Sequence, residues 1–142
     1  TNIQAALGLA QLESLSAYIK KKKIIHERYK KKINKFKDLI ISNTPHFARC
    51  NYWLNILEIR KCLSKKKLSK IIAYFSKNGI ETRPIWYPNH LQKKYRNCQT
   101  YKLKNVNKIY RNRLCIPSSV QLTKKQQDFI CSKLKNIFSL IK

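Results

Sequence analysis

Apolar residues recur at helical spacing along the first quarter of this 142-residue chain, and this pattern constrains the fold more than any other feature. Thr1 and Gln4 are spaced as a capping box, in which two side chains satisfy backbone N–H groups at the start of a helix. The pattern predicts one long helix over residues 2–38, or two helices nearly in line. Its apolar positions are Ile3, Leu7, Ala10, Leu12, Leu15, Ile19, Ile24, Ile25, Tyr29, Ile33 and Phe36.

A helix of this length cannot be covered by the rest of so short a chain. Its first half carries small residues that would let another backbone approach closely, namely Ala5, Ala6, Gly8 and Ala10. Gly8 costs a helix about 1 kcal/mol relative to alanine, and a tight packing contact would explain its presence. We therefore expect the N-terminal half to pack on a surface outside this chain. The lysines at 20–23 are expected to form a solvated face.

The remaining sequence alternates between strand and helix patterns. Strand-forming residues fill 52–59, 80–86 and 114–116. Helical spacing covers 68–75, which Gly79 closes at the C′ position, and a short stretch at 106–110.

A second capping box, formed by Thr123 and Gln126, opens a final helix. The order of elements predicts an α+β fold, a small α/β unit of three-layer-like character with about three strands packed by helices. We divide the chain into a long helix, 1–38, and a small domain, 39–142.

Basic side chains dominate the composition, with 32 Lys and Arg against six Asp and Glu and a formal net charge of +26. Such a charge attracts polyanions, and a nucleic-acid binder is the first interpretation. The excess is lysine, however, and lysine, isoleucine and asparagine share A/T-rich codons, so genome composition is a competing explanation. Arginine is the side chain that phosphate and base readers favour. A free-standing basic nucleic-acid-binding protein therefore stays as the alternative function.

Several classes of protein are disfavoured. No apolar run approaches the roughly 20 residues of a membrane-spanning helix, and the N-terminus has no secretory signal pattern. No CxxC pair or zinc-finger spacing is present, so no metal site is expected. Reduced thiols at Cys50, Cys62, Cys98, Cys115 and Cys131 favour a cytoplasmic protein. The chain begins with Thr rather than Met, and we expect it to be processed, trimmed or a piece of a longer protein.

One segment, residues 79–90, concentrates polar groups on a backbone stiffened by two prolines. Arg83 there can bind an anion, Trp86 and Tyr87 can form an aromatic wall, and His90 can make hydrogen bonds. The structural alternative is an edge strand and turn, with Trp86 in the core and Arg83 in a surface ion pair.

No catalytic constellation is visible elsewhere. Six acidic residues make any carboxylate pair depend on distant segments, and two separated glycines cannot form a phosphate-binding loop. Trp53 is expected in the core or on the sheet face. We therefore expect no catalytic residue in this chain and no complete enzyme.

Three stretches, in order, resemble the DegT/DnrJ/StrS family of sugar aminotransferases. Residues 1–13 (TNIQAALGLAQLE) resemble a family signature, and residues 79–86 (GIETRPIW) with His90 resemble its small-domain segment. Residues 114–119 (LCIPSS), followed by Leu122 and Thr123, resemble its closing strand and last helix. The resemblance covers essentially the whole chain and is nearest to enzymes that aminate C4 of nucleotide-linked 4-keto sugars.

The resemblance implies the C-terminal domain of a pyridoxal-phosphate-dependent enzyme of the aspartate-aminotransferase fold (type I). Such enzymes pass an amino group from glutamate to a nucleotide-linked 4-keto-6-deoxy sugar, usually for surface polysaccharide or glycan synthesis. They are homodimers, and the cofactor supplies the electron sink. The lysine that carries the cofactor lies in a large domain upstream. We therefore expect a C-terminal fragment that is inactive alone and has no specific nucleic-acid or membrane partner.

The resemblance also implies roles for five residues. Asn2 and Gln4 resemble positions near the active site and the dimer interface, where they would help to bind the cofactor. Arg83, Tyr87 and His90 lie in the segment that approaches the substrate. Arg83 would meet the diphosphate, and Tyr87 and His90 would meet the sugar or the nucleotide. A structural role is the alternative for each.

Overall fold

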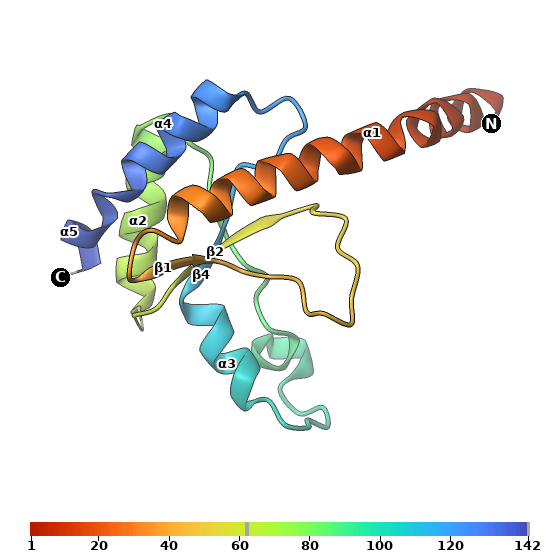
Figure 1. Ribbon diagram of the computed structural model, residues 1–142. Coiled ribbons are helices and arrows are strands. Elements are labelled where there is room, and N and C mark those ends of the chain that lie inside the picture. Colours follow the sequence, from red (N-terminus) through yellow and green to blue (C-terminus); the bar gives the residue numbers. More distant parts are fainter. Residues whose placement is uncertain (62, 142) are drawn as a thin grey trace.

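The computed structural model describes residues 1–61 and 63–141, and it confirms the predicted α+β fold (Figure 1). Cys62, one of the five thiols expected to be reduced, lies outside the described residues, and the other four cysteines form no disulfide. The elements are α1 (Asn2–Ile33), β1 (Leu39–Ile41), β2 (Asn55–Ile59), α2 (Lys65–Lys77), β3 (Arg83–Pro84), the 3₁₀ turns η1 (Asn89–Leu91) and η2 (Lys93–Tyr95), α3 (Lys104–Arg111), β4 (Arg113–Ile116), α4 (Lys124–Leu134) and α5 (Ile137–Ile141).

The long N-terminal helix is a single element, and its predicted capping box between Thr1 and Gln4 is present. It ends at Ile33, five residues before the predicted end at 38. Asn34 ends it, because its side-chain oxygen accepts a hydrogen bond from the backbone N–H of Ile41 at 3.3 Å. That bond folds the chain directly from the helix into β1.

The N-terminal half of α1 projects beyond the rest of the domain (Figure 1). Its apolar side chains are exposed; Ile3 is 74% exposed and Leu12 is 66% exposed. A Cβ added at Gly8 would meet no atom within 4 Å. The described part of this chain thus leaves the small-residue surface uncovered, as the length of the helix predicts.

The sheet has four antiparallel strands in the order β1-β2-β4-β3, so the prediction of about three strands is wrong by one. The missed strand, β1, is only three residues long, and such a run is too short to show alternation. The predicted strand at 52–59 begins later, at Asn55, because Tyr52 has a positive φ of 55° that no strand accommodates. The predicted strand at 80–86 pairs with β4 only at Arg83 and Pro84.

One face of the sheet forms the core. Its inward side chains alternate with half-buried ones along β1, β2 and β4. Helices α1, α2, α4 and α5 cover this face, with Tyr29, Phe75 and Leu134 fully buried against it. The opposite face is only half-buried, so the domain has two layers where a three-layer-like arrangement was expected. The buried strand residues are Leu39, Ile41, Asn55, Leu57, Ile59, Leu114 and Ile116.

Helix α4 packs on α1 through polar contacts as well as apolar ones. The predicted capping box of Thr123 and Gln126 opens α4, which ends at Leu134 before the separate α5. The Asp128 carboxylate accepts hydrogen bonds from Lys32 and Arg28, and these hold its pKa below the usual value. Among the described residues, no helix is long and apolar enough to cross a bilayer.

Gly79 closes α2 as predicted, and its substitution gives a first test of the fold. Its φ is +69°, and Ile80 donates its backbone N–H to Phe75 across the turn at 2.9 Å. Because an added Cβ would meet nothing within 4 Å, Gly79→Ala tests backbone strain alone and should lower the free energy of unfolding by about 1–2 kcal/mol. Gly8→Ala, in a helix and equally unobstructed, should not lower it. Urea denaturation of both variants measures this difference in stability. An unchanged unfolding midpoint for Gly79→Ala would contradict the predicted backbone strain at Gly79.

Candidate functional site

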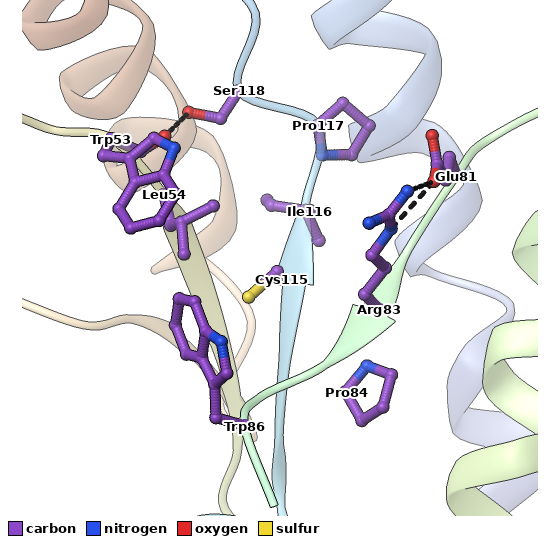
Figure 2. Close-up of a pocket in the computed structure, with 10 residues that line it drawn as sticks. All are labelled: Trp53, Leu54, Glu81, Arg83, Pro84, Trp86, Cys115, Ile116, Pro117 and Ser118. Carbon is purple, nitrogen blue, oxygen red and sulfur yellow. Dashed lines mark hydrogen bonds and ion pairs between the residues drawn. The ribbon is translucent and has the colours of Figure 1, made fainter.

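A groove lies on the half-buried side of the sheet, where β4 ends (Figure 2). It has a volume of about 440 Å³ and takes side chains from β3, β4 and the segment that leads into β2. Figure 2 shows Trp53 and Trp86 on one side of β4 and the pair of Arg83 with Glu81 on the other. We call it the tryptophan groove; its lining is Trp53, Leu54, Glu81, Arg83, Pro84, Trp86, Cys115, Ile116, Pro117 and Ser118.

Trp53 and Trp86 form an aromatic wall along one side of the groove. Their ring centroids are 5.8 Å apart and their planes are tilted by 50°. Trp53 is 62% exposed and Trp86 is 65% exposed, so the structural alternative that placed Trp86 in the core is wrong. Two exposed indoles side by side offer an apolar surface to a sugar ring or a flat base.

Arg83 supplies the cationic side of the groove. Its Nε donates a hydrogen bond to Glu81 Oε1 at 2.8 Å, which is the surface ion pair that the structural alternative predicted. Both side chains are about three-quarters exposed, at 77% and 73%, and exposed ion pairs contribute little to stability. The guanidinium can therefore leave Glu81 for a phosphate, which it binds through two parallel hydrogen bonds.

Cys115 faces the groove from β4, and its environment argues against a nucleophilic role. Burial raises the pKa of the Cys115 thiol, which keeps it protonated at neutral pH. A thiolate, not a thiol, is the reactive form. Cys115 is therefore held as a thiol, not as a nucleophile.

Tyr87 and His90 do not line the tryptophan groove. The Tyr87 ring packs edge-on against Tyr110 of α3, with centroids 5.3 Å apart. His90 Nε2 and Asn107 Oδ1, also on α3, are 2.9 Å apart. The 79–90 segment thus divides after Trp86, and the structure brings only Arg83 of the three predicted substrate-binding residues into the groove.

Asn2 and Gln4 lie at the exposed tip of α1, where it projects from the domain (Figure 1). The Gln4 side chain accepts hydrogen bonds from the Thr1 ammonium and hydroxyl groups at 2.9 and 3.1 Å. Helix capping therefore occupies Gln4 in this structure, and no other element of the described chain reaches either residue.

Trp53 and Ser118 line the groove, although no sequence pattern predicts either of them as a site residue. Both are far in sequence from the 79–90 segment, and β2 and β4 bring them to it by pairing with each other. Asn55 pairs with Ile116 in this ladder, which places the residues just before one strand beside those just after the other. An aromatic residue ahead of a strand carries no signal that separates a groove wall from a core position.

The groove residues do not fit a complete pyridoxal-phosphate site. The cofactor needs a lysine for its covalent link, and no lysine lines the groove. It also needs a carboxylate beside its ring nitrogen, and the one acid of the groove, Glu81, is paired with Arg83. Within residues 1–61 and 63–141, no three His, Cys, Asp or Glu side chains gather as metal ligands. Covalent chemistry therefore needs groups that this groove does not contain.

Curated proteins of similar sequence include two GDP-perosamine synthases. The GDP-perosamine synthase of Escherichia coli O157:H7 is 31% identical over 140 residues, covering 98% of this chain and 36% of the synthase. The GDP-perosamine synthase of Caulobacter vibrioides is 28% identical over 140 residues, covering 96% of this chain and 37% of that protein. The chain thus spans little more than a third of the length of the curated relatives it matches.

Solved structures show the same fold at lower identity. The aminotransferase TlmJ from Streptoalloteichus hindustanus superposes with a TM-score of 0.82 at 16% identity, over 97% of this chain and 36% of that one. Helicobacter pylori PseC, an aminotransferase involved in the biosynthesis of pseudoaminic acid, gives 0.77 at 20% identity, over 96% and 37%. The model of the DegT/DnrJ/EryC1/StrS aminotransferase family matches residues 1–135. This chain, with its long helix and antiparallel sheet, belongs to that family.

Proposed function

We propose that this chain is the C-terminal part of a pyridoxal-phosphate-dependent nucleotide-sugar aminotransferase. It would supply the interdomain helix, 1–38, and the small domain, 39–142, to an enzyme whose large domain lies outside it. One observation carries the proposal: the family match spans residues 1–135, yet the chain covers only 36–37% of the synthases. The exposed apolar half of α1 is the surface that such a domain would cover.

The proposed reaction transfers an amino group from glutamate to a nucleotide-linked 4-keto-6-deoxy sugar, for surface polysaccharide or glycan synthesis in the cytoplasm. The likeness to two GDP-perosamine synthases supports this substrate class. The cofactor would supply the electron sink, held mainly by the large domain of a homodimer. This chain would contribute binding and orientation of the sugar nucleotide.

The tryptophan groove is the proposed contact surface for the substrate. Trp53 and Trp86 would pack against the sugar or base ring, and Arg83 would exchange Glu81 for the diphosphate. Tyr87 and His90, on the α3 side of the same segment, remain proposed contacts for the sugar or nucleotide.

Asn2 and Gln4 are proposed to lie next to the cofactor. They occupy the tip of α1, the part of the described chain that reaches farthest from the small domain (Figure 1). A large domain that covers this half of the helix would surround both residues, and Gln4 would then exchange its capping bond for a cofactor contact.

The isolated 142-residue chain is expected to be inactive and to hold no cofactor at a specific lysine, because its groove contains none. After incubation with pyridoxal phosphate and borohydride reduction, peptide mapping should find scattered labelling over many lysines. The enzyme that carries this chain, given glutamate and the keto-sugar nucleotide, should form the amino sugar. A stoichiometric adduct on one lysine of the isolated chain would contradict the proposal.

The nucleic-acid alternative rests on the net charge of +26. If the chain makes specific phosphate contacts, the logarithm of its affinity for nucleic acid should fall steeply and linearly with the logarithm of the salt concentration. Measurable binding should then remain at physiological salt. Binding that disappears there would leave only nonspecific attraction.

A further inference from the structure

Lys22 differs from its neighbours in the lysine run of α1. It lies four residues before His26 and seven before Tyr29, so it is on the helix face that packs into the domain. Lys21 and Lys23 are exposed, whereas Lys22 is partly buried. The prediction of a solvated face over 20–23 is therefore wrong at this position.

The Lys22 ammonium group joins two chain segments that line the groove. Its Nζ donates hydrogen bonds to the backbone carbonyl of Ser118 at 2.7 Å and to that of Trp53 at 3.1 Å. These carbonyls lie just after β4 and just before β2. Burial lowers the pKa of Lys22, in keeping with an ammonium group withdrawn from water. Hydrogen bonds from a charged donor are about twice as strong as neutral ones.

A chain of polar contacts supports the same two segments. Ser118 Oγ donates to the Trp53 carbonyl at 2.8 Å and accepts from Asn55 Nδ2 at 3.2 Å (Figure 2 shows the first bond). Asn55 Oδ1 then lies 2.9 Å from His26 Nδ1. Because the Asn55 amide nitrogen is the donor to Ser118, its oxygen is the acceptor and His26 Nδ1 carries the proton. These contacts run from Lys22 through Ser118 and Asn55 to His26, and Lys22 and His26 are one turn apart on α1.

The backbone just before Trp53 needs this support. Tyr52 has a φ of 55°, in the left-handed region that residues with a side chain disfavour. The His26 ring packs against the Tyr52 ring with centroids 5.0 Å apart. The backbone N–H of Trp53 donates a hydrogen bond to Asn51 Oδ1 at 3.0 Å. Contacts from α1 therefore secure a strained turn that leads into an exposed indole.

We propose that Lys22 is a positioning residue of the tryptophan groove, which fixes the Trp53 backbone against Ser118 so that the Trp53 indole stays beside that of Trp86. It links the long helix to one wall of the groove. The positioning of Trp53 by Lys22 does not depend on the proposed function. Only its effect on substrate binding in the groove rests on that function.

The test uses 5-fluorotryptophan in the full chain, whose only tryptophans are Trp53 and Trp86. Trp53→Phe and Trp86→Phe assign the two fluorine resonances. Lys22→Met should move the Trp53 resonance at least halfway toward that of free 5-fluorotryptophan. Lys22→Arg should restore it, because a guanidinium group can donate to both carbonyls. Lys21→Met, which removes an exposed lysine from the same helix, should leave it in place.

A folded Lys22→Met variant with an unchanged Trp53 resonance would overturn the proposal, and so would an equal shift in Lys21→Met. Ser118→Ala decides the matter if Lys22→Met loses its helical circular dichroism. It removes the hydroxyl bond to Trp53 and should shift the same resonance in the same direction; no shift overturns the proposal. None of these measurements involves a substrate, so their failure is distinct from a failure of the proposed function.

Discussion

Tyr29→Ala is expected to lower the free energy of unfolding by about 3–5 kcal/mol, the usual cost of truncating a fully buried aromatic residue. Tyr29 is 0% exposed and lies where α1 packs on the sheet. Its hydroxyl also donates to the Pro117 carbonyl at 3.1 Å, at the end of β4. The substitution removes both contacts at once. Urea denaturation of the chain measures the loss.

Two controls separate these contributions. Tyr29→Phe keeps the ring but leaves the Pro117 carbonyl without its donor, which should cost about 1–3 kcal/mol. Tyr101→Ala removes a ring that is 77% exposed and should change stability by less than about 0.5 kcal/mol. Equal effects for Tyr29→Ala and Tyr101→Ala would contradict the packing of α1 on the sheet.

The same residue predicts a dependence of stability on pH. Burial raises the pKa of Tyr29 well above its ordinary value of 10.0, so the phenol ionises first in the unfolded chain. Its contribution to stability is therefore complete below about pH 10 and falls as pH rises further. Tyr29→Phe has no phenol to ionise, so it should lose less stability at alkaline pH than the parent chain does. The measurement is the change in the free energy of unfolding between pH 8 and a pH above about 10, compared between the two proteins.

Arg83→Ala, made in the enzyme that carries this chain, is expected to lower kcat/KM for the nucleotide sugar by about 10- to 150-fold. A hydrogen-bonded contact between charged groups is worth about 1.5–3 kcal/mol, which converts to this range. Arg83 lines the groove on the side opposite the two indoles, and its guanidinium forms an exposed ion pair with Glu81. Half-reaction kinetics with glutamate should stay unchanged, because that step does not use the diphosphate.

Glu81→Gln is the matched control for this prediction. It breaks the Arg83–Glu81 pair but leaves the guanidinium in place and freer to bind phosphate. We expect kcat/KM for the nucleotide sugar to stay level or rise. If Glu81→Gln and Arg83→Ala lowered it equally, Arg83 would act through its pair rather than on the substrate.

The elements that the sequence predicts best are those with local causes. The start of α1, the start of α4 and the end of α2 follow from capping boxes and a glycine, and all three are confirmed. The end of α1 was placed too late because apolar spacing continues through Phe36 while Asn34 bonds to a strand that sequence spacing does not reveal. The strand β1 was missed because it is stabilised by pairing with β2, not by its own three residues.

The sequence predicts only the groove residues that lie within the 79–90 segment. Arg83 and Trp86 are three residues apart and stay together, whereas the 3₁₀ turn at Asn89–Leu91 and contacts with α3 take His90 elsewhere. Lys22 binds the carbonyls of Trp53 and Ser118, which are 31 and 96 positions away. Such contacts depend on how strands pair, and no local pattern marks one lysine among four.

Reading the genomic DNA directly upstream of the Thr1 codon tests the central proposal most directly. If the chain is the C-terminal part of an aminotransferase, the reading frame stays open for roughly two hundred or more codons, as a separate domain requires. Those codons would encode the cofactor-binding lysine that the tryptophan groove lacks. A start codon or an in-frame stop immediately before Thr1 would contradict the account, because the chain would then stand alone without that lysine.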